Sequence, residues 1–269
     1  MKTKVVITGV SGRMGLALLE GVFADEALTL HAAIDREGSS MIGQDAGAQF
    51  GIDSGVKVTS DFNAALKNAD VLIDFTRPEV AIQYLKACQQ ANVNMVIGTT
   101  GFTEQEKKQI VETAKIIPIV FAPNMSVGVT LLINLVEQAA KVLSEGYDIE
   151  VVEMHHRHKV DAPSGTALRL GEAAAQGLGK DLKDCAIYAR EGVTGEREAG
   201  KIGFATLRGG DVVGDHTVIY AGTGERVEIT HKASSRATFA LGALRSAKFL
   251  SQKSAGLYDM RDVLGFKTS

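Results

Sequence analysis

The first half of the chain alternates short apolar runs with amphipathic segments, and this alternation limits the possible folds more than any other feature of the sequence. Six runs rich in Val, Ile and Leu are separated by segments whose apolar residues recur at helical spacing. Strands that alternate with helices in this way predict a parallel sheet with helices on both faces. We expect the strands at residues 5–7, 28–34, 56–59, 71–73, 95–97 and 118–121. We expect helices at residues 14–22, 62–66, 81–91 and 103–115.

The pattern changes beyond a long apolar helix that we expect from Val127 to Leu143. Four predicted strands follow with few helices between them, which indicates a largely antiparallel or mixed sheet. They lie at residues 147–154, 203–208, 216–220 and 226–231, and predicted helices at 233–249 and 260–264 come after them. The sequence therefore predicts an α/β fold: a Rossmann-like doubly wound parallel sheet plus a second α+β domain with a mixed or antiparallel sheet.

The first predicted turn, Gly9-Val10-Ser11-Gly12-Arg13-Met14-Gly15, has the glycine spacing G-x-x-G-x-x-G. Val10 stands where the strict dinucleotide fingerprint has its middle glycine, so the turn by itself could be an ordinary tight turn. Asp35, however, ends the second predicted strand roughly 20–25 residues later, where a carboxylate can bind the adenosine ribose hydroxyls. Together the two features predict a dinucleotide site.

Two further segments bear on the cofactor. Arg36 follows Asp35 directly; a carboxylate suits the free 2′-hydroxyl of NAD, whereas a guanidinium suits the 2′-phosphate of NADP. We therefore expect both NADH and NADPH to be usable. The turn at residues 98–101 could hold the nicotinamide ribose or carboxamide, although plain turn chemistry explains its glycines and threonines equally well. Residues 38–55 are rich in Gly, Ser and Asp and predict a long loop.

A cation-rich stretch stands in front of a predicted helix start in the second half of the chain. It contains His155, His156, Arg157, His158 and Lys159, and it is followed by Asp161-Ala162-Pro163-Ser164-Gly165-Thr166-Ala167. Ser164 is a good N-cap for a helix that begins at Gly165. The positive end of that helix favours a carboxylate or phosphate, and glycine allows a close approach to the backbone. The stretch therefore predicts a site that binds an anion and transfers protons.

Two plainer interpretations of this stretch remain open. Three histidines suggest zinc, but they lack the usual pairing on one helix face and no cysteine lies nearby, so we expect no metal. A solvated basic loop is the second alternative. The formal net charge of −3, with interleaved signs, argues against a nucleic-acid or membrane binder and favours a small anion as the partner. Two scattered cysteines and no visible targeting segment favour the cytoplasm.

Several motifs in the chain closely resemble those of the 4-hydroxy-tetrahydrodipicolinate reductase (dihydrodipicolinate reductase) family. The longest is the stretch His155-His156-Arg157-His158-Lys159 followed by Asp161-Ala162-Pro163-Ser164-Gly165-Thr166-Ala167. The others are Gly12-Arg13-Met14-Gly15, Asp74-Phe75-Thr76-Arg77-Pro78, Gly98-Thr99-Thr100-Gly101-Phe102, Arg190-Glu191-Gly192 and His231-Lys232-Ala233-Ser234-Ser235-Arg236. The resemblance covers nearly the whole chain.

The resemblance implies an NAD(P)H-dependent reductase of the diaminopimelate route to lysine, which converts 4-hydroxy-tetrahydrodipicolinate to tetrahydrodipicolinate. It implies that His155 is the proton donor and acceptor, that Lys159 is a proton donor, and that His156, Gly165 and Thr166 bind substrate. It implies cofactor contacts from Gly9, Val10, Ser11, Gly12, Arg13, Met14, Asp35, Arg36, Gly98, Thr99, Thr100, Ala122, Pro123, Asn124 and Met125.

The resemblance also implies a homotetramer assembled through the second domain. Residues 1–126 and 236–269 then form the dinucleotide-binding domain, and residues 127–235 form the substrate-binding and oligomerisation domain. Two other functions remain as alternatives: a nicotinamide dehydrogenase of another amino-acid pathway, and a non-catalytic redox sensor that binds a dinucleotide.

Four residues of extended chain span about 13 Å, which is too far for His155 and Lys159 to serve one ring atom. We therefore expect the strand to end near Met154 or His155. The chain must also bend between the two residues. Because the segment 160–163 can turn only after Lys159, we expect the loop to bring Lys159 back toward Gly165.

Overall fold

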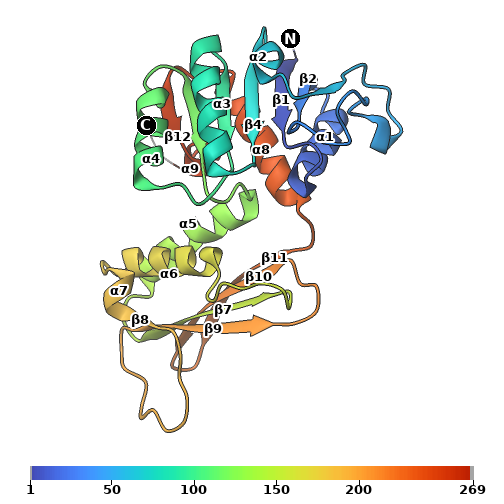
Figure 1. Cartoon of the computed structure of the whole chain (residues 1–269). Helices are drawn as coiled ribbons and strands as arrows, with labels where there is room; N and C mark the ends of the chain where they lie inside the picture. The colour runs from blue at the N-terminus through green and yellow to red at the C-terminus, as the bar shows by residue number, and fades with distance from the viewer. Residues whose placement is uncertain (1, 267–269) are drawn as a thin grey trace. The chain divides into compact units, whose positions relative to one another are not determined.

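A computed structural model describes residues 2–266, and its backbone contacts divide the chain into two compact units (Figure 1). The first unit contains the N-terminal residues up to Val127 and resumes at Arg236. The second unit is the segment Gly128–Ser235. The chain therefore leaves the first unit, builds the second and returns to complete the first.

The first unit contains a sheet of seven strands that are all parallel, in the order β12-β6-β5-β4-β1-β2-β3. The strands are β1 (Thr3–Thr8), β2 (Leu28–Ile34), β3 (Val58–Thr59), β4 (Val71–Asp74), β5 (Asn94–Ile97), β6 (Pro118–Phe121) and β12 (Gly256–Tyr258). The six predicted strands and the Rossmann-like fold are confirmed. The edge strand β12 was not predicted, because three residues beginning with glycine carry no period-2 pattern.

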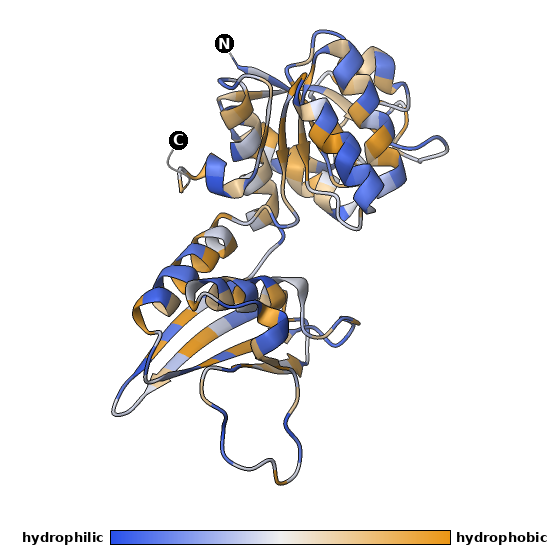
Figure 2. Cartoon of the chain, turned by 90° about the vertical axis from the view of Figure 1, so that its left-hand side faces the viewer, coloured by the Kyte–Doolittle hydropathy of each residue, from blue (hydrophilic) through white to orange (hydrophobic). Residues whose placement is uncertain are grey.

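Helices cover both faces of this sheet, as its buried strands require. One face packs against α1 (Arg13–Ala24) and α8 (Ala237–Leu250), and the other against α2 (Phe62–Leu66), α3 (Pro78–Ala91) and α4 (Glu104–Ala114). Figure 2 shows the apolar strands between the more polar outer surfaces of these helices. The short helix α9 (Met260–Val263) follows β12, and a 3-10 turn at Ala48–Phe50 interrupts the predicted long loop. A capping box of Thr103 and Glu106 begins α4.

Two glycines let backbone segments of the first unit approach each other closely. A Cβ atom built on Gly15 in α1 would lie 2.2 Å from the carbonyl oxygen of Gly9 in the turn after β1. A Cβ atom built on Gly242 in α8 would lie 1.7 Å from the carbonyl oxygen of Met125. Real Cβ atoms do not come so close to backbone, so both contacts require glycine. The glycine turn is therefore packed directly onto its helix.

The second unit contains a mixed sheet of five strands in the order β11-β10-β7-β9-β8. The elements of this unit are α5 (Val127–Val142), β7 (Tyr147–His155), α6 (Gly165–Gly177), α7 (Leu182–Cys185), β8 (Ala186–Ile187), β9 (Ile202–Arg208), β10 (Gly214–Gly222) and β11 (Arg226–Ala233). Strand β7 pairs parallel with β9 and antiparallel with β10, which confirms the predicted mixed sheet. Strand β11 continues through Ala233, so helix α8 starts at Ala237 and not at Ala233 as predicted.

Strand β7 shows how the sheet of the second unit divides into a core face and a site. Its residues alternate between half-buried and buried, and Ile149 and Val151 pack with α5 and α6 in the core. The next two buried positions are Glu153 and His155. Because strand side chains alternate with period 2, these polar residues lie on the same face as the core residues. The apolar face of β7 therefore ends in a carboxylate and an imidazole.

Within residues 2–266, no helix is long and apolar enough to cross a membrane.

Candidate active site

His155 is the last residue of β7 and is held by its own strand. Its Nδ1 atom lies 2.5 Å from the Oε2 atom of Glu153, and its side chain is 10% exposed. The backbone carbonyl of His155 accepts a hydrogen bond from Gly209 at 3.0 Å, at the end of the neighbouring strand β9. The predicted proton donor and acceptor is therefore fixed at the edge of a packed core, with its Nδ1 atom occupied.

Glu153 connects several parts of this region. Arg208 donates to both of its carboxylate oxygens, at 2.8 and 2.9 Å, and the backbone N–H of Ser164 donates to Oε1 at 3.0 Å. Burial by itself raises the pKa of a carboxyl group, but the hydrogen bonds from Arg208, His155 and Ser164 outweigh burial and hold the pKa of Glu153 below its ordinary value. Glu153 is therefore a buried, ionised carboxylate.

The start of α6 lies directly beside this carboxylate. Ser164 is the N-cap of α6, and its Oγ atom accepts a hydrogen bond from the N–H of Ala167 at 3.1 Å, which confirms the predicted helix start. The residue after the cap, Gly165, is exposed, and nothing lies within 4 Å of the place where its Cβ would be. The predicted substrate residues Gly165 and Thr166 therefore form the open first turn of a helix that is anchored to Glu153.

The loop between His155 and Ser164 turns earlier than the sequence led us to expect. The N–H of Lys159 donates to the carbonyl of His156 at 3.1 Å, so the turn lies at residues 157–158, before Lys159. The cause is the neighbouring segment: carbonyls of Val212 and Gly210 accept from the N–H groups of His156 and Arg157, at 2.7 and 3.2 Å. The predictions that the strand ends at Met154 or His155 and that the chain bends between His155 and Lys159 are confirmed, although this turn precedes the segment 160–163, where the sequence placed one.

Lys159 is paired within its own loop. Its Nζ atom donates to both carboxylate oxygens of Asp161, at 2.7 and 2.9 Å, and its side chain is 21% exposed. The hydrogen bond from Lys159 lowers the pKa of Asp161. A partly exposed ion pair between flexible groups contributes little to stability, so Lys159 can exchange Asp161 for an anionic ligand at low cost.

His216 on β10 completes the cluster. Its Nε2 atom lies 3.0 Å from Ser164 Oγ, and its ring meets the ring of His155 edge to face, with centroids 5.0 Å apart. Burial, assisted by the neighbouring His155, lowers the pKa of His216 to about 4. His231, which is opposite His216 on β11, also has a lowered pKa, chiefly because of burial. His216 is therefore neutral at neutral pH.

The lowered pKa of His216 predicts a specific loss of stability in acid. The unfolded chain takes up this proton near the ordinary pKa of 6.5, but the folded chain does so only near 4. The contribution of His216 is therefore fully present above about pH 6.5 and is lost as the pH falls toward 4. At about 1.4 kcal/mol per pH unit, the loss is roughly 3 kcal/mol across this window. The free energy of unfolding, measured with denaturant between pH 4.5 and 7, should change less steeply with pH in His216→Gln than in the wild type. The exposed-residue control His158→Gln should keep the pH dependence of the wild type. An unchanged pH dependence in His216→Gln would contradict the assignment.

The remaining histidines of the motif do not converge on one point. His156 is partly buried, and its Nδ1 atom has no hydrogen-bond partner among the described residues, whereas His158 is exposed. The rings of His156 and His158 are 6.2 Å apart. Within residues 2–266 no group of three His, Cys, Asp or Glu side chains has a geometry suited to a metal ion.

We accordingly expect activity to be independent of metal ions. Exhaustive chelation followed by gel filtration should leave kcat within about twofold of the untreated enzyme, because the described residues offer no group of three His, Cys, Asp or Glu side chains arranged to hold a metal ion. Activity that is lost on chelation and restored by zinc alone would assign these histidines to a metal instead.

The predicted cofactor residues lie at the carboxyl edge of the parallel sheet. Gly9 to Met14 follow β1, Asp35 and Arg36 follow β2, Gly98 to Thr100 follow β5, and Ala122 to Met125 follow β6. The strand order reverses between β1 and β4, and this edge next to such a reversal is the usual ligand position in doubly wound sheets. The fold therefore brings all of the predicted cofactor segments to one edge.

Asp35 is already tied to the glycine turn. Its Oδ2 atom accepts from the N–H of Ser11 at 3.1 Å and from Ser39 Oγ at 2.8 Å, and Oδ1 accepts from the N–H of Arg36 at 2.9 Å. Burial opposes ionisation, but these hydrogen bonds together hold the pKa of Asp35 below its ordinary value. The side chain of Arg36, by contrast, is exposed. The ionised carboxylate of Asp35 and the exposed guanidinium of Arg36 therefore belong to adjacent residues.

The departure from the strict fingerprint at Val10 has a structural reason. The Val10 side chain is fully buried in the core on the α1 face of the sheet, and its N–H donates to the carbonyl of Ile34 at 3.2 Å. Its side chain points away from the turn surface. A valine is therefore compatible with a ligand that contacts only the backbone of the turn.

Asp74 ties three strand ends together beneath this edge. It is fully buried, and its carboxylate accepts hydrogen bonds from the hydroxyls of Thr8 (2.7 Å), Thr76 (2.8 Å) and Thr99 (2.6 Å). Burial raises the pKa of Asp74 despite these hydrogen bonds. Asp74 belongs to one of the motifs quoted for the family resemblance, but the sequence assigned it no role. Its contacts hold the turn that begins at Gly98 in a defined position.

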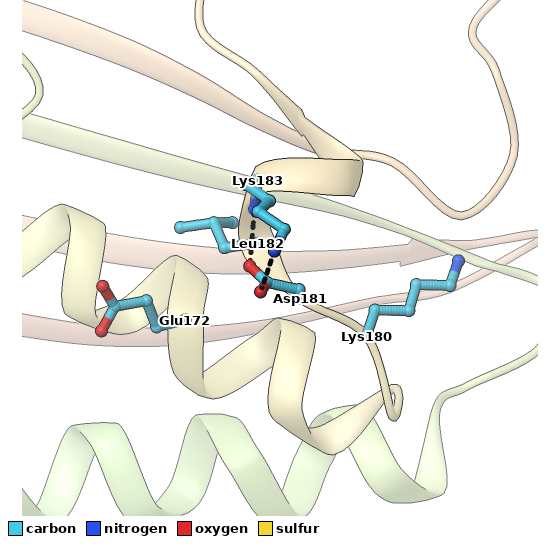
Figure 3. Close-up of a pocket in the computed structure, with 5 residues that line it drawn as sticks. All are labelled: Glu172, Lys180, Asp181, Leu182 and Lys183. Atoms are coloured by element: carbon cyan, nitrogen blue, oxygen red, sulfur yellow. Dashed lines mark hydrogen bonds and ion pairs between the residues drawn. The ribbon is translucent and has the colours of Figure 1, made fainter.

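A hollow of about 470 Å³ follows the C-terminal end of α6 and is lined by Glu172, Lys180, Asp181, Leu182 and Lys183 (Figure 3). Figure 3 shows Asp181 and Lys183 paired with each other. None of the predicted site residues lines this hollow. It belongs to the opposite end of α6 from Ser164 and plays no part in the site described above.

Sequence reasoning missed four residues of the second-unit cluster. The position of Glu153 could have been predicted, because a residue two positions before His155 in a strand must share its face. The positions of Arg208 and His216 could not, because only the registers of β7 with β9 and with β10 bring them to Glu153. Ser164 was predicted as a helix cap but not as a partner of Glu153 and His216.

Comparison with known proteins agrees with these observations. A family model for the N-terminus of dihydrodipicolinate reductase matches residues 3–125, and a model for its C-terminus matches residues 128–264. The 4-hydroxy-tetrahydrodipicolinate reductase of Thiobacillus denitrificans is 64% identical over 267 residues, which cover 99% of this chain and 100% of that protein. The protein of the same name from Chromobacterium violaceum is 60% identical with the same coverage.

A solved structure is also similar. Dipicolinate-bound dihydrodipicolinate reductase from Paenisporosarcina sp. TG-14 superposes with a TM-score of 0.78 at 25% sequence identity, covering 96% of this chain and 98% of that one. A probable dehydrogenase from Thermotoga maritima, at 11% identity and a TM-score of 0.63, shares the fold.

Proposed function

The chain belongs to the dihydrodipicolinate reductase family, and on this basis we propose that it reduces 4-hydroxy-tetrahydrodipicolinate to tetrahydrodipicolinate in the diaminopimelate route to lysine. It is an NAD(P)H-dependent oxidoreductase. The observation that carries the proposal is the anchored imidazole of His155 beside the open, positively polarised start of α6. Such a pairing suits a substrate that is both an anion and a proton acceptor.

In the proposed mechanism His155 and Lys159 transfer protons while the second unit holds the dicarboxylate. The Nε2 atom of His155 is the nitrogen left for proton transfer, because Nδ1 is bound to Glu153. Lys159 donates a proton and offsets the negative charge of the ring substituents. His156, Gly165 and Thr166 bind a substrate carboxylate at the positively polarised start of α6.

The residues of the first unit fit a nicotinamide dinucleotide. The start of α1, which follows the glycine turn and has no side-chain cap, suits a pyrophosphate, and the carboxylate of Asp35 suits ribose hydroxyls. The cofactor supplies the hydride; the chain binds and orients it through Gly98 to Thr100 and Ala122 to Met125. We assign the first unit to cofactor binding, and the second to substrate binding and oligomerisation.

We expect NADH and NADPH both to support turnover, with kcat/KM values within about a thousandfold, or roughly 4 kcal/mol. The reason is that Asp35 can bind a 2′-hydroxyl and the exposed Arg36 a 2′-phosphate. Arg36→Ala should reduce kcat/KM for NADPH by about tenfold or more and leave NADH nearly unaffected. Equal losses with both cofactors would mean that Arg36 does not bind the phosphate.

Absorbance at the reduced-nicotinamide band tests the function directly. The purified protein should oxidise NADH and NADPH when 4-hydroxy-tetrahydrodipicolinate is supplied. A redox sensor would bind the cofactor with no loss of absorbance. A dehydrogenase of another amino-acid pathway would be inactive with this compound but active with its own substrate, and either result would reject the proposed function.

We further propose a cytoplasmic homotetramer that uses the second unit for assembly. The face of the five-stranded sheet opposite α5 and α6 carries no helix within the described part of the chain (Figure 1). Both cysteines, Cys88 and Cys185, are buried and free, as suits a reducing compartment. Light scattering coupled to gel filtration should give the mass of four chains. A monomer at micromolar concentration would reject the assembly.

A further inference from the structure

We propose that Glu153 is a positioning residue: it holds His155 in the tautomer with the proton on Nδ1 and thereby makes Nε2 the nitrogen that transfers protons. This inference rests on the proposed function of His155. It adds a residue, and a direction of proton transfer, that neither the motif nor the comparisons assign. A neutral imidazole has two tautomers, and which one is present depends on the hydrogen bond that its other nitrogen makes.

The position of Glu153 follows from the strand. Glu153 and His155 are two residues apart in β7, so both side chains stand on the same face, and Glu153 Oε2 comes within 2.5 Å of His155 Nδ1. Glu153 is only 1% exposed, so no water competes for that oxygen. The contact is therefore built into the strand and does not depend on a mobile loop.

The charge of Glu153 decides which atom carries the proton. Its other partners, the guanidinium of Arg208 and the N–H of Ser164, can only donate. These donors stabilise the ionised form, in agreement with the lowered pKa of Glu153. An ionised carboxylate only accepts, so His155 Nδ1 must be the donor. Nε2 then carries the lone pair in the neutral imidazole and the second proton in the imidazolium.

Gly214 of β10 flanks the Nε2 side of the imidazole. A Cβ atom built on Gly214 would come within 3.0 Å of His155 Nε2. Glycine therefore keeps the imidazole free of a side-chain contact there. The ring of His216 approaches edge to face at an interplanar angle of 76°, and His216 bonds to Ser164 rather than to His155.

Glu153 also sets the position of His155 relative to the substrate residues. Ser164, whose N–H binds Glu153, caps α6 immediately before Gly165. Arg208 donates to Glu153 and also to the carbonyl of Asp161, at 2.7 Å. One carboxylate thus joins the end of β7, the Lys159 loop and the start of α6.

Nuclear magnetic resonance of ring-labelled histidine tests the tautomer without any activity measurement. The variant Glu153→Gln keeps the shape of the side chain but has only one acceptor oxygen, which Arg208 and Ser164 will occupy. Its amide NH₂ then faces His155 Nδ1, and we expect the proton to move to Nε2. Long-range proton–nitrogen spectra at about pH 9, well above the ordinary imidazole pKa, distinguish the two forms. The signals of His155 are those lost in His155→Asn.

Wild type should show the Nδ1–H form and Glu153→Gln the Nε2–H form. Glu153→Asp keeps the charge and should retain the Nδ1–H form. An Nε2–H form in wild type, or an Nδ1–H form that persists in Glu153→Gln, overturns the proposal. Because the wild-type spectrum is decisive by itself, the test stands even if the Gln variant does not fold.

Kinetics then test whether the tautomer matters for turnover. Glu153→Gln should lower kcat by about 100-fold or more with KM changed less than about threefold, as expected for a base held in the wrong tautomer. In a His155→Asn background the same substitution should change kcat less than about twofold, because Glu153 acts through His155. Equal losses in both backgrounds would show a purely structural role and overturn the proposal.

Glu150 provides the matched control. It lies on the opposite face of β7 and is also bound by arginines, Arg190 at 2.8 and 3.0 Å and Arg197 at 3.0 Å. Glu150→Gln should leave the His155 tautomer and kcat unchanged. If His155→Asn itself retains full kcat, the proposed role of His155 fails, while the spectra still report separately whether Glu153 sets its tautomer.

Discussion

Replacing His155 or Lys159 by alanine is expected to lower kcat by about 10²–10⁴ while cofactor affinity stays close to that of the wild type. The expectation follows from where the two groups lie. His155 ends a rigid strand with only Nε2 available, and Lys159 projects from the adjoining loop with Asp161 as its exchangeable partner. Both residues belong to the second unit, whereas the proposed cofactor segments belong to the first. Stopped-flow turnover and NADH titration monitored by fluorescence measure the two quantities separately.

The double variant should lose less than the product of the two single losses, because groups that serve one proton event do not act independently. Thr166→Val provides the contrast: it should raise the substrate KM and leave kcat nearly intact, since the proposed role of Thr166 is to hold a carboxylate. If Lys159→Ala retains full kcat and raises only KM, then Lys159 is an anion anchor. The proton donor would then be His155 or a bound water.

The second large effect is expected for Gly15→Ala. A methyl group at Gly15 would lie 2.2 Å from the carbonyl oxygen of Gly9 and 2.6 Å from the Cα of Val10, and backbone cannot rotate away as a side chain can. The glycine turn must shift or α1 must withdraw, at a cost of roughly 3 kcal/mol. We expect the Kd for NADH to rise by about 100-fold, equivalent to about 2.7 kcal/mol, together with a lower unfolding midpoint.

Gly21 in the same helix is the matched control. A methyl group there would lie 2.5 Å from Cδ1 of Leu244, the end of a flexible side chain that can adopt another rotamer. Alanine also favours the helix by up to about 1 kcal/mol, so Gly21→Ala should be nearly neutral in stability and unchanged in NADH affinity. Normal NADH binding by Gly15→Ala would contradict the view that close packing of α1 on the turn shapes the cofactor site.

Local signals explain why much of this molecule could be predicted. The strand–turn–helix at residues 3–24, the capping box of Thr103 and Glu106 and the Ser164 cap depend on neighbours within a few residues. Their chemistry is therefore visible in a short window of sequence. The alternation of strands and helices then leaves few topologies for the first unit.

The features that escaped prediction depend on contacts distant in sequence. Arg208 and His216 reach Glu153 across 55 and 63 residues, through strand registers that no local pattern specifies. The turn at residues 157–158 depends in the same way on carbonyls of Gly210 and Val212. Asp74 was recognised as part of a sequence motif, but its three threonine partners come from the ends of different strands. Long-range pairing therefore explains most of what was missed.

The late position of α8 in the chain has a consequence for synthesis. Helix α8 supplies Ala240, Ala243, Leu244, Ala247 and Leu250 to the same core as α1 and its strands. A nascent chain that has reached only residue 235 therefore contains every strand of the second unit, whereas the face of the parallel sheet that packs against α1 and α8 still lacks α8. Until α8 emerges from the ribosome, part of that apolar face stays uncovered, and the inserted unit can complete its folding before the unit that began first.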